Sequence, residues 1–160
     1  MFDHSEEVTR GVIESIPDGR YAVEAAAHND GISDELVPFE IVPFEIVGEV
    51  ADSDIIVDVS NAPPQTEGPI NCTPPTIVSR TRCAIMALAA GGETANEGHF
   101  RPIEVRTRPG TLLHCLPPAP MAMYSWPSIH AIDHIHRALA GVVPERVPAQ
   151  PGSDVGAFNA

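Results

Sequence analysis

A short polar run, Asn96–Ile103, brings together several groups that can act on a substrate. It contains a side-chain amide (Asn96), a carboxylate (Glu97), a glycine and a guanidinium (Arg101), just ahead of a segment that reads as a strand. Loops on a rigid sheet often carry recognition groups, and an Arg there can bind a carboxylate or phosphate through paired hydrogen bonds. The alternative is that Glu97 and Arg101 pair with each other and only fix the loop.

A second group of polar residues, His130, Asp133, His134 and His136, has the composition of a metal site. On a helix, His130 and His134 lie one turn apart and can share a face. Asp133 and His136 point elsewhere, and no third ligand is specified. We therefore expect surface or helix-terminal histidines and no metal site, although zinc or nickel binding here stays open as an alternative. A Ser-His-Asp triad is not indicated either, since the chain has no G-x-S-x-G motif.

The hydrophobic pattern and the turn residues predict the elements that hold these groups. Strands concentrated early and helices interleaved late favour an α+β domain with a mixed, mostly antiparallel sheet and two or three helices. The expected helices are 5–16, 76–90 and 128–140, and the expected strands are 20–24, 54–60, 103–107 and 111–113.

A tandem copy, Val37–Ile41 followed by Val42–Ile46, interrupts this pattern. Two prolines five residues apart suit an edge strand or an extended arm. We interpret the copy as a local duplication that lengthens a surface hairpin.

Composition excludes several classes of function. The 160 residues predict one domain, and 9 basic against 22 acidic residues give a net charge of −13, which disfavours nucleic acid and anionic membranes as partners. All nine cations are Arg. Without Lys the chain can form neither a Walker-type phosphate loop nor a Schiff base.

The cysteines and the termini indicate where the protein works. Cys72, Cys83 and Cys115 are widely spaced, so neither a disulfide framework nor a zinc finger is suggested. The first residues are acidic and unlike a signal peptide. The uncharged stretch 109–132 contains five prolines, which excludes a continuous membrane-spanning helix. We expect a cytoplasmic protein with no membrane partner.

Short motifs in a fixed order then point to a family. They are Ile16–Tyr21 (I-P-D-G-R-Y), Asp58–Asn61 (D-V-S-N), Pro64-Gln65, Gly68–Asn71 (G-P-I-N), Asn96–Ile103 (N-E-G-H-F-R-P-I), Pro109–Thr111, Pro117–Ala119, Ser128 with Asp133, Ala138-Leu139, and Val147–Ala149 with Gly152. This order resembles the hydantoinase B/5-oxoprolinase family, which also includes the acetone carboxylase large subunit. Val59 and Asn61 stand where the family has Phe and Gly.

Family members are several times longer, so the resemblance implies a fragment of a larger family fold. The resemblance makes residues 1–160 a single domain similar to the C-terminal part of the hydantoinase B/oxoprolinase fold. Because the chain end is rich in Gly and Pro, we expect residues 150–160 to form a flexible tail. The resemblance also implies an ATP-dependent cyclic-amide hydrolase acting with a hydantoinase A-like, ATP-binding subunit. No cofactor is then bound by this chain alone: ATP is bound by the partner, and a divalent metal is possible in the complete enzyme.

The resemblance also selects site residues by motif position. An activated amide needs donors for its developing oxyanion. Asn96 and Arg101 are candidates for that role, Glu97 for orienting or carrying a proton, and Asn71 and Asp58 for binding the substrate. Two alternatives within the family are an ATP-dependent ketone carboxylase subunit and a non-catalytic remnant.

Overall fold

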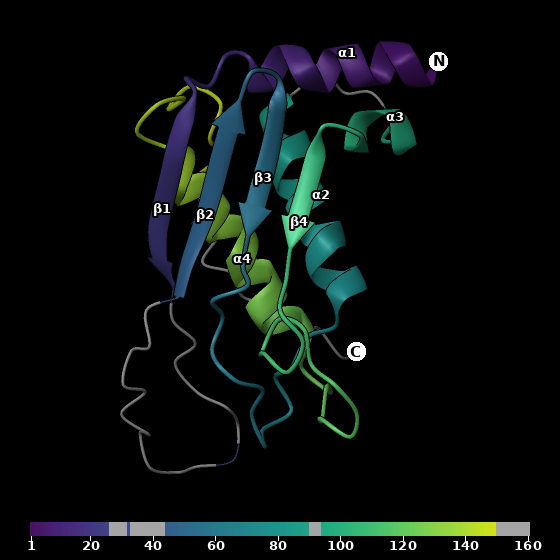
Figure 1. Ribbon diagram of the computed structural model, residues 1–160, viewed down its shortest axis with the longest axis vertical. Helices are drawn as coiled ribbons and strands as arrows, with labels where there is room; N and C mark the ends of the chain where they lie inside the picture. Colours follow the sequence, from purple (N-terminus) through teal and green to yellow (C-terminus); the bar gives the residue numbers. More distant parts are fainter. Residues whose placement is uncertain (26–31, 33–43, 90–93, 150–160) are drawn as a thin grey trace, which may run out of the picture.

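The computed structural model describes residues 1–25, 32, 44–89 and 94–149 (Figure 1). Its element order is α1 (Phe2–Ile13), β1 (Gly19–Ala25), β2 (Phe44–Ala51), β3 (Asp54–Asp58), α2 (Pro74–Ala89), α3 (Glu97–Phe100), β4 (Ile103–Arg106) and α4 (Ser125–Leu139). The α+β class predicted from the sequence is confirmed. The duplicated segment up to Pro43 and the expected tail 150–160 lie outside the described residues.

The four strands form one mixed sheet in the order β1-β2-β3-β4. β1 pairs antiparallel with β2 and β2 with β3, whereas β3 and β4 are parallel, with Ile55 opposite Ile103 and Asp58 opposite Arg106. A parallel pair needs a crossover connection, and the segment containing α2 and α3 supplies it. The sheet is therefore mostly antiparallel, as expected.

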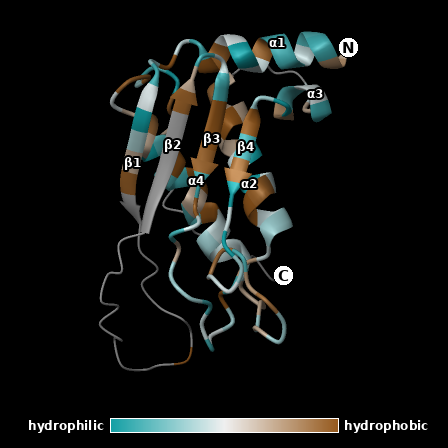
Figure 2. Cartoon of the chain, in the orientation of Figure 1, coloured by the Kyte–Doolittle hydropathy of each residue, from teal (hydrophilic) through white to brown (hydrophobic). Residues whose placement is uncertain are grey.

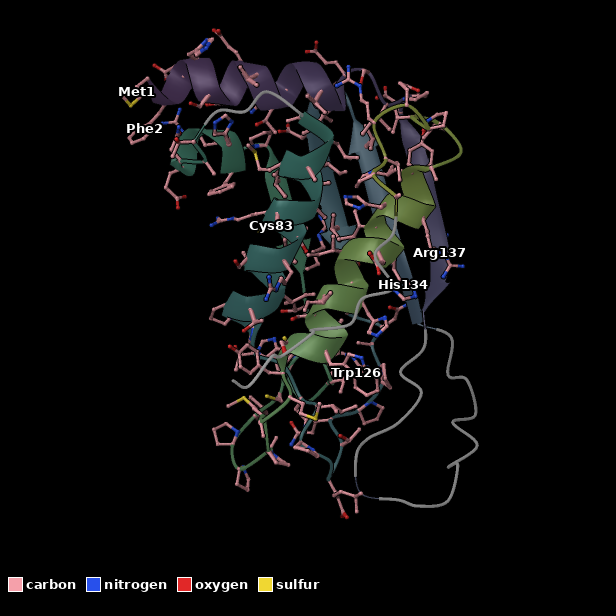
Figure 3. All side chains as sticks on the ribbon, turned by 180° about the vertical axis from the view of Figure 1, so that it is seen from behind. Met1, Phe2, Cys83, Trp126, His134 and Arg137 are labelled. Atoms are coloured by element: carbon pink, nitrogen blue, oxygen red, sulfur yellow. The ribbon has the colours of Figure 1, made fainter. Side chains whose placement is uncertain are left out.

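Helices α2 and α4 cover one face of the sheet, and α1 lies across the end where β3 and β4 begin (Figure 1). β3 is rich in β-branched residues and strongly apolar (Figure 2). Seen from behind, α2 and α4 lie side by side against the sheet (Figure 3). Pro74 and Pro75 open α2, where the missing N–H groups cost nothing.

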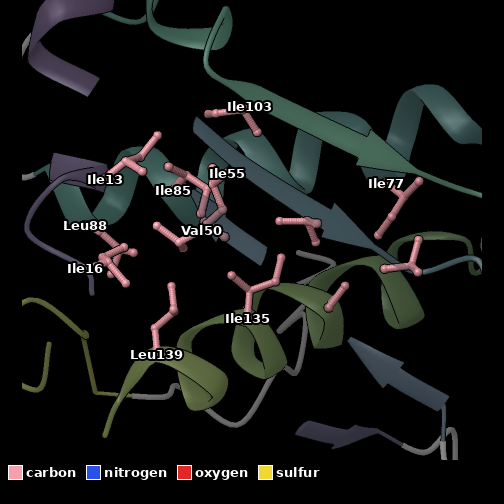
Figure 4. Packing of buried hydrophobic residues seen from close by; sticks show 14 of the residues in the cluster. Ile13, Ile16, Val50, Ile55, Ile77, Ile85, Leu88, Ile103, Ile135 and Leu139 are labelled. Carbon is pink, nitrogen blue, oxygen red and sulfur yellow. The ribbon is translucent and has the colours of Figure 1, made fainter. Parts of the chain in front are cut away.

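The core fills the space between this sheet face and the helices (Figure 4). Each contributing element presents branched aliphatic residues at its own period, alternating on strands and every three or four on helices. Core residues include Ile13, Ile16, Val50, Ile55, Val57, Ile77, Ile85, Leu88, Ile103, Ile135 and Leu139.

Several local expectations differ from the structure. The first helix, expected over 5–16, is α1 at Phe2–Ile13. The segment 111–113 forms no named strand; Thr111 makes isolated bridges to Pro64 and His114. Helix α4 begins at Ser125, three residues before the expected start, because Pro127 fits its first turn. Residues 97–100, expected as loop, form the short helix α3.

Phe44–Ile46, the described end of the duplication, pairs with β1. These residues do not pair with β3, because the β2–β3 pairing begins at Val47. This end extends the pairing of β2 with β1, and the interpretation of the duplication as a whole stays a prediction.

Candidate functional site

Asn96 caps helix α3 and ties it to α1. Its Oδ1 accepts a hydrogen bond from Gly98 N at 2.9 Å, and its Nδ2 donates to Ser5 Oγ at 2.9 Å. This is a side-chain N-cap of the kind that Asn favours. Asn96 thus uses both its polar groups inside the chain, where it orients the residues that follow it.

The contact between α1 and α3 is close enough to involve main chain on both sides. A Cβ placed on Gly98 would lie 2.8 Å from the carbonyl carbon and from Cα of Phe2. His99 is fully buried, and its Nδ1 is 3.2 Å from Thr9 Oγ1. Figure 3 shows Phe2 beside α3. We call this contact the α1–α3 interface; it holds the polar run rigidly on α1.

Arg101 binds acidic residues of α1 and does not pair with Glu97. Its Nη1 donates to Asp3 Oδ1 at 2.9 Å and to Glu6 Oε2 at 2.8 Å. These bonds raise the pKa of Arg101, the bond to Glu6 most. Among the described residues, Nε and Nη2 of Arg101 have no partner, and its side chain is 47% exposed. One edge of the guanidinium is therefore open to an anion.

Glu97 lies near the same surface as Arg101. The two residues are four apart, and Arg101 keeps helical dihedral angles, so their side chains project from the same side of this turn. The exposed Glu97 makes a long ion pair with Arg82, 3.8 Å between Oε1 and Nη1. The arrangement offers a carboxylate and half of a guanidinium to solvent.

Glu6 joins two arginines beneath this surface. It accepts from Arg10 Nε and Nη2 at 3.0 and 2.9 Å as well as from Arg101, and Arg10 in turn reaches Asp54 at 2.8 Å. Hydrogen bonds from Arg101 and then Arg10 lower the pKa of Glu6 below its ordinary 4.5. Sequence analysis missed this network; only the Glu6–Arg10 spacing of four residues signals part of it.

A test of this network is its pH dependence. A carboxyl group with a lowered pKa stabilises the folded state above pH 4.5, and loses that contribution as the pH falls from 4.5 through the lowered value. We expect Glu6→Gln to lower the thermal midpoint near neutral pH and to flatten its decline as the pH falls below 4.5. The exposed neighbour variant Glu7→Gln is the control, and equal acid sensitivity in all three proteins would contradict the assignment.

Asn71 and Asp58 lie at the other end of the sheet. Asn71 is fully buried; its Oδ1 accepts from Thr66 N at 2.8 Å, and its Nδ2 lies 2.9 Å from the carbonyl oxygens of Thr66, Gly68 and Pro120. Asp58 ends β3, where its Oδ1 accepts from Ser60 N at 2.8 Å.

The two groups of predicted site residues are separated along the strands. Asp58 pairs with Arg106, which comes five residues after Arg101. At the rise of a strand, five residues put roughly 16 Å between Asp58 and Arg101 along the strand direction. The structure therefore brings together Asn96, Glu97 and Arg101 but does not bring Asn71 or Asp58 to them.

An apolar groove of about 350 Å³ adjoins α3. It is lined by Pro75, Val78, Arg82, Cys83, Met86 and Phe100, among others, and the Arg82 guanidinium stacks over the Phe100 ring with 4.5 Å to its centroid. Because Arg82 also approaches Glu97, this groove lies beside the exposed carboxylate.

The histidines of α4 serve the fold. His136 Nε2 donates to the carbonyl of Ala84 at 2.9 Å, joining α4 to α2, and His134 Nδ1 donates to the carbonyl of His130 at 2.6 Å. Burial lowers the pKa of His134. Within residues 1–25, 32, 44–89 and 94–149 no three His, Cys, Asp or Glu side chains are grouped as metal ligands. No helix in that part of the chain is long and apolar enough to cross a bilayer.

Comparison with known proteins identifies the family. The Hydantoinase B/oxoprolinase family model matches residues 1–160. The chain belongs to the hydantoinase B/oxoprolinase family. It is 31% identical over 161 residues to a protein of Pseudomonas sp. (strain NS671) named as a subunit of a D-/L-hydantoinase. That match covers 96% of this chain and 27% of the relative.

A solved structure shares the fold of this hydantoinase B/oxoprolinase chain. The crystal structure of the ATP-dependent caprolactamase from Pseudomonas jessenii superposes with a TM-score of 0.75 at 24% identity. It matches 91% of this chain and 24% of its own. The chain thus spans about a quarter of the length of these relatives.

Proposed function

We propose that this chain is part of an ATP-dependent cyclic-amide hydrolase of the hydantoinase/oxoprolinase type, working with a nucleotide-binding partner subunit. Family membership supports this, as do the names of the relatives, one a hydantoinase subunit and the other an ATP-dependent caprolactamase. One observation carries the proposal. The turn 97–101 is held against α1, and from it the Glu97 carboxylate and one edge of the Arg101 guanidinium are exposed to solvent.

The chemistry assigned to these groups follows from what they can do. Opening a cyclic amide develops negative charge on the carbonyl oxygen, and the free Nε and Nη2 of Arg101 are donors suited to such charge. Glu97 is exposed and only weakly paired, so it can accept and return a proton. Asn96 positions both by capping α3, while Asn71 and Asp58 shape the loops at the other end.

Nucleotide binding is assigned to the partner. The chain has no Lys and so lacks the phosphate-binding loop that uses one. We assign ATP to a hydantoinase A-like subunit, and any divalent metal to other parts of the complete enzyme.

The proposal is tested in a hybrid in which residues 1–160 replace the corresponding segment of the Pseudomonas sp. hydantoinase subunit, combined with an ATP-binding subunit of the same system. We expect ATP-dependent opening of a hydantoin, measured as ring-opened product and ADP. Glu97→Gln should lower the rate about 100-fold, since it removes proton transfer. The control is Glu104→Gln, which alters an exposed carboxylate on β4.

Arg101 needs a separate control because it also binds α1. Arg101→Ala should abolish turnover, whereas Asp3→Asn, which removes one ion pair and spares the open guanidinium edge, should retain most of it. Full activity of both the Glu97 and the Arg101 variants would overturn the site. A folded hybrid without any turnover would instead favour a non-catalytic member of the family.

A further inference from the structure

Strand β4 ends the sheet with one unpaired edge. The carbonyls of Pro102 and Arg106 accept hydrogen bonds from Ile55 N and Val59 N of the β3 side, both at 2.9 Å. Because main-chain groups alternate along a strand, Ile103 and Val105 direct their N–H and C=O groups to the opposite edge. No other strand of the described residues pairs there. Parallel strands are normally covered, and an open edge is a template for another strand.

The apolar groove lies on the same side of the molecule. α2 and α3 flank β4 on the side away from β1 (Figure 1), and Phe100 of the groove comes three residues before β4. Within the described part of the chain, Arg82 Nε is buried without a hydrogen-bond acceptor. Because Arg82 Nε is buried, what the groove offers an incoming chain is its apolar floor and not that donor. We call the open edge of β4 and this groove together the β4-edge face.

The occupant follows from the lengths of the relatives. The matches cover 96% and 91% of this chain but only 27% of the hydantoinase subunit and 24% of the caprolactamase chain. About three-quarters of each relative is therefore polypeptide that has no counterpart in these 160 residues. We propose that the β4-edge face binds that remaining polypeptide, which adds a strand to β4 and places an apolar side chain in the groove. Strand addition supplies main-chain hydrogen bonds, and the groove selects the side chain.

The proposal rests on the proposed function only in treating the chain as part of a larger protein. Its tests use neither ATP nor substrate, so their failure is distinct from absent turnover.

Hydrogen exchange provides the first test. In the intact 160-residue chain the amides of Ile103 and Val105 should exchange fast at all protein concentrations. In the full-length Pseudomonas sp. hydantoinase subunit, the amides at the corresponding positions should exchange at least 100-fold more slowly. Equal rates in the two proteins would overturn the proposal. So would protection in the 160-residue chain that appears with concentration and a dimer mass, since a second copy would then occupy the edge.

Thiol labelling in the hybrid provides the second test. Cys83 is exposed on the outer side of α2 (Figure 3), whereas Cys72 is buried with its pKa raised to about 11. Iodoacetamide should label Cys83 first in the 160-residue chain and at least 10-fold more slowly in the hybrid. Met86→Glu, inside the groove, should restore fast labelling of the hybrid, and the neighbouring exposed Ala87→Glu should not. Unprotected Cys83 in a folded hybrid would overturn the proposal; if the hybrid does not fold, exchange in the full-length relative decides.

Discussion

Gly98→Ala is expected to lower the free energy of unfolding by about 3 kcal/mol, the range in which overpacking a rigid contact falls. The added methyl group would collide with the main chain of Phe2, 2.8 Å from its carbonyl carbon and Cα. Main chain cannot move aside as a flexible side chain can, and Phe2 is the first residue of α1, so the first turn of α1 must shift from α3 or fray. Urea denaturation followed by far-ultraviolet circular dichroism measures the loss.

The matched control is Gly11→Ala on α1. No atom lies within 4 Å of a Cβ placed there, and Ala favours a helix interior over Gly by roughly 1 kcal/mol. Gly11→Ala should therefore be neutral or stabilising. If Gly98→Ala behaved like Gly11→Ala, the α1–α3 interface would not be as close as described.

The second large effect is expected at Asn71. Asn71→Ala removes a fully buried amide whose Oδ1 and Nδ2 serve four main-chain groups, of which Gly68 O keeps a hydrogen bond from Thr66 Oγ1 at 3.2 Å and the other three lose this partner. Each buried unsatisfied group costs about 1–3 kcal/mol, and relaxation recovers part of the sum. We expect a loss of about 3 kcal/mol, measured as a lower urea midpoint.

Asn61→Ala is the control for Asn71, since Asn61 is exposed and belongs to the same loop region. It should change stability by less than about 0.5 kcal/mol. Asn71→Asp should be as damaging as Asn71→Ala, because it replaces the donor with an oxygen facing three carbonyls. Tolerance of Asn71→Asp would show that the amide nitrogen is not the anchor.

The elements that the sequence predicts well are those with strong local periodicity. β3 has consecutive β-branched residues. α2 combines two opening prolines with apolar residues at helical spacing that are buried, namely Ile77, Ala84, Ile85 and Leu88. α3 was missed because four residues are too few to show a period. Its signal was present in Asn96, a favoured N-cap residue one position before the turn.

The expected strand at 111–113 failed for a different reason. Its main-chain groups bond to loops: Leu112 N donates to Pro63 O at 2.8 Å, and Leu112 O accepts from Cys72 N at 2.8 Å. Two consecutive leucines indicate burial, and Leu112 and Leu113 are buried, but they do not say which partner the backbone takes.

The sequence predicts which residues belong to the candidate site, but it does not predict which side chains they contact. The residue types of Asn96, Glu97 and Arg101 indicate their chemistry. The α1 partners of Asn96 and Arg101, which are Ser5, Asp3 and Glu6, lie more than 90 residues away in the sequence. No local pattern encodes such a contact. The separation of Asn71 and Asp58 from the rest of the site likewise depends on strand direction, which becomes known only when β3 and β4 are seen to be parallel.

The α1–α3 interface has a consequence for biosynthesis. Ser5 and Asn96 are 91 residues apart, so at roughly 5–20 residues per second the ribosome needs roughly 5–20 s to deliver the partner of α1. For part of that delay Val12, Ile13 and Ile16 are uncovered, until β3 and α2, which contact α1, have also emerged. The nascent polypeptide therefore passes through a stage that invites chaperone capture, and slow translation between α1 and α3 should reduce the soluble yield.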